Sequence, residues 1–269
     1  MRFVAKQPRE GINVSDTHPL VEAGALIAGL AAIFLIIALA LIFLIEVALY
    51  FVSADKEAEI FAGWLPEDLI TISPTDERLL ETQALVDRLA AHWTDTPYSF
   101  RVEISDFDIA NAMALPGGLI VVTQGLLDQV ESENELAFVL GHELGHFKNR
   151  DHIRALGRSI VLSLFFVAIT GSDVGGLGIT VTDLALRGFS RRQESKADEF
   201  GLAIVNAEYG HVNEALRLFL RWDSGNDFVG DIVTYFSTHP NPGDRVEEMR
   251  AIAEKESWRT DGEIIDLPW

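Results

Sequence analysis

A long uncharged segment near the N-terminus limits what this chain can fold into. Residues 23–45 are 23 consecutive residues without a charged side chain, rich in Ala, Leu and Ile, and Glu22 and Glu46 bracket them. As a helix they extend about 34 Å, enough to cross a hydrocarbon core of about 30 Å. Because apolar residues resume after Glu46, we predict a transmembrane anchor over residues 23–52, preceded by a tail of residues 1–22.

The charges around this segment predict its orientation. Arg2, Lys6 and Arg9 precede it, whereas only Lys56 follows within twenty residues. The positive-inside rule therefore predicts a single-pass membrane protein with a cytoplasmic N-terminus and the rest of the chain on the other side, which is the periplasm in a Gram-negative cell. A signal peptide cleaved near residues 52–54 is the alternative. The apolar segment is longer than the usual 7–15 residues of a signal peptide, which favours an uncleaved anchor.

The segment 142–146 reads His-Glu-Leu-Gly-His, an H-E-x-x-H motif. On a helix the two histidines share one face, so both imidazoles can hold one metal ion, and Glu143 is placed to accept a proton from an attacking water. A capping box at Ser132 and Glu135 predicts that this helix begins there, and its pattern continues to His152. The motif indicates a zinc-dependent peptidase. A buried helix that contains two histidines by chance is the alternative.

A catalytic zinc usually takes three protein ligands, and the chain has no cysteine, so His, Asp or Glu must supply the third. The metzincin pattern requires a Gly and a further His after His146, and that Gly is missing. His152 lies at the wrong helical angle. A predicted helix over residues 190–206 carries Glu194 and Asp198 on one face, suited to bind the metal and to accept the free N–H of a ligand histidine. A solvated charged face is the alternative.

The order of these motifs resembles the HtpX-like and CaaX-prenyl-protease-like family of membrane-anchored zinc endopeptidases, which are gluzincins. The resemblance covers roughly residues 77–256. The matching segments are His142–His146, Ser190-Arg191 with Glu194 and Ala197-Asp198, Asn111–Gly118, and Thr238-His239-Pro240 followed by Arg245. The resemblance implies one Zn²⁺ per chain, with His142, His146 and Glu194 as ligands, Asp198 as the partner of a ligand, and Glu143 as the catalytic base.

The segment ahead of the motif helix predicts a hairpin. Leu115-Pro116-Gly117-Gly118 suits a type II turn, and strand-like residues flank it at 107–113 and 119–123. A strand at a sheet edge can pair with an extended peptide. With the family resemblance, this predicts substrate binding by four consecutive residues, Asn111, Ala112, Met113 and Ala114. An ordinary hairpin is the alternative.

The C-terminal segment contains two further candidates. The resemblance implies that His239 is catalytic, either as a donor to the developing oxyanion, which is worth roughly 3 kcal/mol, or as a cover over the zinc in a resting state. Arg245, near the start of a predicted helix over residues 242–256, is a candidate for substrate binding. A surface ion pair with Glu247 or Glu248 is the alternative.

A second apolar segment separates the two zinc motifs. Residues 160–169 contain only one polar side chain, glycines are frequent over 171–178, and 179–186 is apolar again. Ten residues of helix reach about 15 Å, half a bilayer, so we expect a helical hairpin that packs on the domain or dips into the interface near the anchor. A polytopic protein with three spans is the competing topology. An intramembrane protease is disfavoured by the four polar residues 148–151, directly after the motif.

The remaining composition completes the prediction. A formal charge of −20 disfavours nucleic acid and anionic lipid head groups as partners. We expect a linker over residues 53–75, a zincin-like metallopeptidase domain over 76–258 and a tail over 259–269. The domain should be α+β, mostly helical, with a small antiparallel sheet. Further helices are expected at 77–93 and 213–222, and a further strand at 98–104.

The predicted function is zinc-dependent cleavage of membrane or envelope proteins, including unfolded ones, as in protein quality control. The lipid bilayer would be a partner through the N-terminal helix. The alternative is a zinc-containing, chaperone-like or assembly module that binds unfolded chains with little proteolysis.

Overall fold

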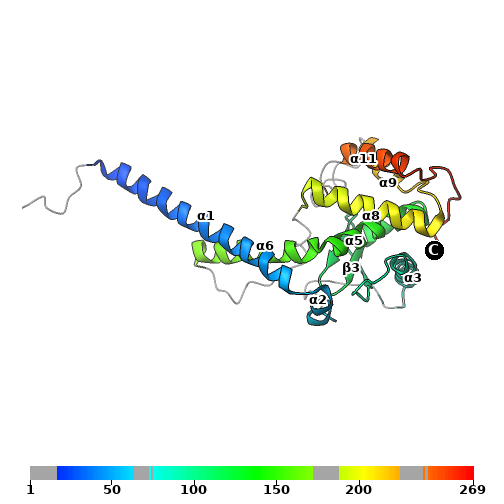
Figure 1. Ribbon diagram of the computed structural model, residues 1–269, viewed down its shortest axis with the longest axis horizontal. Helices are drawn as coiled ribbons and strands as arrows, with labels where there is room; N and C mark the ends of the chain where they lie inside the picture. Colours follow the sequence, from blue (N-terminus) through cyan, green and yellow to red (C-terminus); the bar gives the residue numbers. More distant parts are fainter. Residues whose placement is uncertain (1–16, 64–72, 74, 172–187, 225–238, 240–241) are drawn as a thin grey trace, which may run out of the picture.

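The structure is a computed structural model that describes residues 17–63, 73, 75–171, 188–224, 239 and 242–269. A single long helix, α1 (Pro19–Phe51), extends away from the folded domain (Figure 1). None of its residues is buried, and among the described helices it alone is long and apolar enough to cross a membrane. The predicted apolar helix is therefore confirmed, while its orientation remains a prediction.

The residues after α1 are bound to the domain. The first part of the expected linker forms α2 (Ala54–Ile60), and Glu57 within it is buried. The Arg150 guanidinium donates to Glu57 at 2.9 Å and to the backbone carbonyls of Leu49 and Val52 at 2.8 and 2.6 Å. His152 also contacts Glu57. These bonds attach the C-terminal end of α1 to the middle of the chain.

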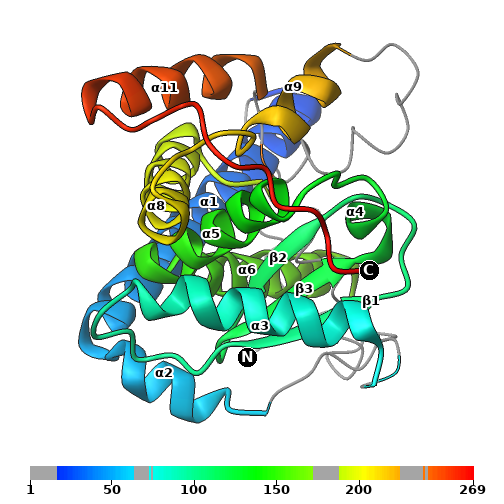
Figure 2. The ribbon, with the colours of Figure 1, turned by 90° about the vertical axis from the view of Figure 1, so that its right-hand side faces the viewer.

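The domain contains one small sheet between helices (Figure 2). The strands β1 (Arg101–Ser105), β2 (Ala112–Leu115) and β3 (Leu119–Thr123) are arranged in the order β1-β3-β2. β2 and β3 form the predicted antiparallel hairpin, whereas β1 is parallel to β3, so the small sheet is mixed rather than wholly antiparallel. Helix α3 (Glu77–Ala91) packs against β1, and α4 (Gln124–Leu127) follows β3.

The predicted helix over residues 132–152 is in fact two helices. α5 (Glu133–Asn149) ends at Arg150, whose φ of 58° is left-handed, and α6 (Asp151–Thr170) begins directly after it. Ser132 caps α5 as expected by accepting from Glu135 N at 3.2 Å. The change of direction lets α6 leave the domain and pack along α1 (Figure 1).

α6 contains the first arm of the expected helical hairpin. A Cβ on Gly157 would lie 2.7 Å from Ile45 Cγ2, so the glycine allows the two helices to approach closely. The arm over residues 160–169 is therefore placed beside the anchor. The turn after Gly171 and the second arm fall within residues 172–187, outside the described residues.

α8 (Arg191–Tyr209) crosses α5 at short range and brings the second motif to the first. A Cβ on Gly145 would lie 2.7 Å from Ala197 Cα, and one on Gly141 would lie 3.2 Å from Gly201 Cα. Small residues on both helices therefore set the distance between the two motifs.

Of the remaining described helices, α11 (Pro242–Lys255) packs on α8, and α9 (Arg217–Ser224) packs on α11. α9 begins four residues later than expected, because the residues before it form a turn. Residues 259–269, the expected tail, pack on the domain. Ile265 O accepts from Glu133 N at 2.9 Å, and Trp269 contacts the hydrophobic core.

Candidate metal centre

Four side chains from three parts of the chain meet in the buried centre of the domain. α5 contributes His142 and His146, α8 contributes Glu194, and His239 comes from the C-terminal part of the chain. One nitrogen or oxygen from each lies within 4.8 Å of the others, and all four residues are buried. Two of them are a helical turn apart on α5, and the close α5–α8 crossing supplies the third.

The spacing of these atoms fits a tetrahedral metal ion. The two Nε2 atoms of His142 and His146 are 3.1 Å apart, and Glu194 oxygens lie 3.6 Å from each. His239 Nδ1 lies 3.2 Å from His142 Nε2 and 3.2 Å from Glu194. Zinc bonds of about 2.0–2.1 Å place tetrahedral ligand atoms about 3.3–3.4 Å apart, close to these separations. His239 thus lies where the fourth ligand of the ion would be.

Each of the two motif histidines has a carboxylate behind it. His142 Nδ1 lies 2.8 Å from Asp198 Oδ1, and His146 Nδ1 lies 3.2 Å from Asp151 Oδ2. A proton on each Nδ1 donates to its carboxylate and leaves Nε2 free to bind a metal. The Asp198 bond is the one expected from sequence. Asp151 is a partner that sequence reasoning missed.

The electrostatics of the group follow from its burial. Burial lowers the pKa of His142 to about 4, partly offset by Asp198. Burial alone would raise the pKa of Glu194, but His239, His142 and Arg245 together lower it. A histidine that is neutral and a carboxylate that is ionised near neutral pH are the protonation states that bind a metal ion.

Glu143 lies beside this group without belonging to it. Its carboxylate accepts no hydrogen bond from a described side chain, the Ala114 backbone lies close enough to lower its pKa slightly, and Oε1 is 3.8 Å from His239 Nε2. Burial raises the pKa of Glu143, against smaller opposing effects of His239 and His146. A buried carboxylate that is unpartnered and has a raised pKa is suited to exchange protons with a bound molecule.

Arg245, at the start of α11, is buried and faces the same group. Its Nε donates to Asp198 Oδ2 at 2.8 Å and its Nη1 lies 2.8 Å from Glu194 Oε2. The surface ion pair with Glu247 or Glu248 is therefore wrong. Arg245 thus positions two carboxylates, those of Asp198 and Glu194. Its predicted contact with substrate stays a prediction.

The predicted substrate strand lies next to the motif helix. The expected strand over residues 107–113 was placed too early, since β2 begins at Ala112. β2 is an edge strand that packs on α5. Asn111 O accepts from Thr123 N at 3.0 Å, so alternation along the strand points the N–H and C=O of Ala112 and Ala114 away from β3. Asn111 and Met113 pair with β3 instead.

The comparisons with known proteins agree with this geometry. The sequence profile of Peptidase family M48 matches residues 76–253, about two-thirds of the chain. The chain belongs to peptidase family M48. This is the family of the HtpX-like and CaaX-prenyl-protease-like enzymes, so the resemblance drawn from the motifs is confirmed. The buried histidine and glutamate group fits the metal site that is typical of M48 zinc proteases.

Several curated relatives are similar over the M48 region. The mitochondrial metalloendopeptidase OMA1 of Schizosaccharomyces pombe is 29% identical over 157 residues, which are 57% of this chain and 45% of that protein. The putative beta-barrel assembly-enhancing protease of Vibrio cholerae is 29% identical, over 61% of this chain and 36% of that protein. The metalloprotease LoiP of Escherichia coli is 29% identical, over 50% and 56%. The chain thus spans about half or less of these relatives.

Two residues near the M48 motifs had no clear signal in the sequence. Asp151 follows the unexpected end of α5, and only that break turns it back toward His146. Phe189 stacks on the His146 ring, with centroids 4.0 Å apart, and also lies 5.7 Å from the His239 ring. The aromatic side chain covers one side of the metal centre.

Proposed function

We propose that this protein is a zinc-dependent endopeptidase, with one Zn²⁺ per chain held by His142, His146 and Glu194. The observation that supports this most is the buried set of ligand atoms, whose separations match a tetrahedral zinc ion. Membership of family M48 supports the same activity.

The roles of the surrounding residues follow from their contacts. When bound, zinc would polarise the scissile carbonyl and lower the pKa of the attacking water. Glu143, which is buried and accepts no hydrogen bond from a described side chain, would take the proton of that water and return it to the leaving amine. Asp198 and Asp151 would fix the orientation of the two histidines, and Arg245 would hold Asp198.

His239 is proposed as the cover of the resting site. Its Nδ1 lies at 3.2 Å from both His142 Nε2 and Glu194, in the position that catalysis requires for water. Substrate and water would have access only after His239 leaves this position. The alternative role, donation to the oxyanion, would need His239 to point at the substrate carbonyl rather than at the ligands.

Substrates are proposed to be polypeptides in an extended conformation. The outward C=O groups of Ala112 and Ala114 suit pairing with such a chain next to Glu143, and the Ala112 N–H would first have to leave Asn111 Oδ1, to which it donates at 2.9 Å. Relatives named beta-barrel assembly-enhancing protease and the long apolar helix α1 favour membrane or envelope proteins as the substrate class, including unfolded ones. Single-pass anchoring, with the catalytic domain on the non-cytoplasmic side, is part of the proposal. Nucleic acid is not a proposed partner.

A chaperone-like module with little proteolysis is the second candidate. The position of His239 favours it, because a fourth protein ligand would leave no place for water. A single substitution at Glu143 distinguishes the two candidates, because it should abolish cleavage and leave the binding of unfolded chains intact.

The test uses the full chain, purified with zinc, and casein as an unfolded substrate. Wild-type protein should cleave casein in a manner that a chelator stops and added Zn²⁺ restores. Glu143→Gln should bind one zinc with wild-type affinity and lose activity by about 10²–10⁴-fold. Glu133→Gln, in the first turn of the same helix, is the matched control. Wild-type cleavage by Glu143→Gln, or wild-type protein that binds zinc and casein without cutting, would contradict the proposal.

A further inference from the structure

A polar cavity of about 600 Å³ lies where α5, α6 and α8 meet below the end of the anchor. Its lining contains six cations and two carboxylates, a strong local reversal in a chain of net charge −20. The cations are Lys148, Arg150, Arg154, Arg158, Arg192 and Lys196, and the carboxylates are Glu46 and Asp151. The N-terminus of α8 also lies at the cavity through Ser190, and a helix N-terminus adds positive potential.

Two of the six cations already have partners. Arg150 is bound to Glu57 and to carbonyls at the end of α1, and Arg154 Nε lies 2.9 Å from Glu46. The other four, Lys148, Arg158, Arg192 and Lys196, have no carboxylate within 4.0 Å in the described part of the chain. Lys148 rests over the Phe200 ring at 4.1 Å. The cavity therefore has cationic donors left for a ligand from outside.

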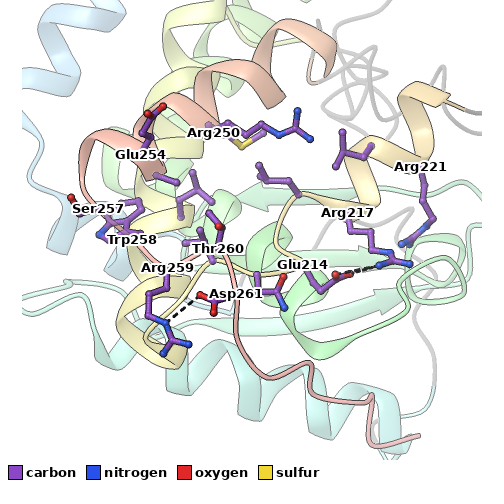
Figure 3. A pocket seen from close by; sticks show the side chains of 17 residues that line it. Glu214, Arg217, Arg221, Arg250, Glu254, Ser257, Trp258, Arg259, Thr260 and Asp261 are labelled. Atoms are coloured by element: carbon purple, nitrogen blue, oxygen red, sulfur yellow. Dashed lines mark hydrogen bonds and ion pairs between the residues drawn. The ribbon is translucent and has the colours of Figure 1, made fainter.

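A second hollow on the surface does not have this excess of cationic side chains over carboxylates. The surface between α9, α11 and the C-terminal segment encloses about 930 Å³, and two of its four arginines pair with acids of the same lining (Figure 3). Arg217 pairs with Glu214 at 3.0 Å and Arg259 with Asp261 at 3.4 Å. The larger hollow is nearly balanced in charge, whereas the smaller one is cationic.

The position of the cationic cavity indicates what its ligand is. Gly157 of α6 contacts Ile45, the last residue of the uncharged segment of α1, and Glu46 lines the cavity. On α6 the charged residues end at Arg158, and the residues from Ile160 onward are almost wholly apolar. The two antiparallel helices thus change from apolar to charged at the same level. With α1 in a bilayer, that level is the head-group region.

We propose that this cavity binds the phosphate group of an anionic phospholipid from the adjacent leaflet. The phosphate would be held by Arg158, Arg192 and Lys196. The acyl chains of the lipid would then lie beside the apolar parts of α1 and α6. The net charge of −20 disfavours anionic head groups as partners of the whole domain, but the surface at this cavity is locally positive. The proposal depends on α1 lying in a membrane and not on peptidase activity.

The test measures lipid binding to the full chain in detergent by native mass spectrometry. Phosphatidylglycerol and phosphatidylcholine of equal chain length are titrated in parallel, and inorganic phosphate is titrated alone and as a competitor. Wild-type protein should bind one phosphatidylglycerol in preference to phosphatidylcholine. A triple variant, Arg158→Gln, Arg192→Gln and Lys196→Gln, should lose this binding by about a hundredfold, since each surface cation contributes about fivefold.

The matched control removes three cations outside the cavity by Arg191→Gln, Arg250→Gln and Lys255→Gln. It should keep the preference of the wild type, and thermal unfolding should show that both triple variants are folded. The single variant Arg158→Gln, with an expected loss of a few-fold, serves if the triple variant is unstable. Equal binding of both lipids, equal loss in the two triple variants, or binding of inorganic phosphate as tight as that of phosphatidylglycerol would overturn the proposal.

Discussion

The metal centre and the cationic cavity are two charged sites with opposite designs. In the metal centre the charged groups are buried and compensate one another, as Asp198 does with Arg245 and Asp151 with His146. In the cavity, Arg192 and Lys196 are exposed and have no carboxylate within 4.0 Å among the described residues. Burial makes an unpaired charge costly, so internal partners are required, whereas an exposed site can leave cations for a ligand.

Asp151 connects the two sites. One of its oxygens lies 3.2 Å from His146 Nδ1, and the other accepts from Gln193 Nε2 at 2.6 Å. Gln193 and Asp151 both line the cavity. The contrast between the sites is therefore testable by substitutions that act on one, on the other or on the residues between them.

The largest effect is expected at a metal ligand. Glu194→Gln should lower zinc affinity by more than about a hundredfold, because an amide is a weak ligand and Arg245 loses one of its two carboxylate partners. Zinc content and competition with a chelator measure the change. Glu199→Gln, exposed on the same helix, should behave as wild type. A Glu194→Gln protein with wild-type zinc affinity would remove Glu194 from the ligand set.

A smaller loss of zinc affinity is expected at the carboxylates that hydrogen-bond to the ligand histidines. Asp151→Asn should lower zinc affinity by about 10–100-fold, because the acceptor of His146 Nδ1–H loses its charge. Asp198→Asn should have an effect of the same order through His142. If zinc affinity falls for Asp198→Asn and not for Asp151→Asn, the connection between the two sites has no influence on the metal.

The attachment of the anchor depends on pH. Arg150 and His152 hold the pKa of Glu57 below its ordinary 4.5, against the opposing effect of burial. The lowered pKa means that this stabilisation is complete above pH 4.5 and is lost as pH falls through the folded-state value. Glu57→Gln should cost about 1–2 kcal/mol of unfolding free energy at pH 7.

Thermal unfolding of wild type and Glu57→Gln, followed as pH is lowered, measures this contribution. The difference between the two proteins should shrink below pH 4.5. Glu59→Gln, exposed on the same short helix, is the matched control. A difference that stays constant with pH would show that the charge of Glu57 is not what holds α2.

The smallest effect is expected at the cover. His239→Ala should raise kcat/KM by a few-fold, because the fourth ligand position becomes free for water, and should weaken zinc binding slightly. Kinetics with an unfolded substrate and parallel zinc titration measure both. A fall in kcat/KM at unchanged zinc affinity would assign His239 to the oxyanion instead, and no change in either would exclude both roles.

The features predicted well from sequence depend on local spacing. An apolar segment of helical length, two histidines a turn apart, and two acids a turn apart on α8 each present a pattern that one element satisfies alone. The close approach of α8 to α5 occurs at Gly141 and Gly145, where a side chain would meet Gly201 and Ala197.

The features missed depend on how distant segments meet. Arg150 adopts a left-handed conformation without being Gly or Asn, so no residue type signalled the end of α5 or the return of Asp151. The parallel pairing of β1 with β3 has no local signal, because β2 separates the two strands in the chain and no single turn connects them. The cationic cavity combines residues 46 to 196, and net charge averages such a patch away.

The zinc environment of the full-length protein tests the account most directly. X-ray absorption at the zinc edge should show a four-coordinate ion with three imidazoles and one carboxylate in the wild type. In His239→Ala the ion should keep four ligands, of which two are imidazoles and two are oxygen donors. A wild-type ion bound by two imidazoles or fewer, or a protein purified at pH 7 that binds no zinc at all, would contradict the account.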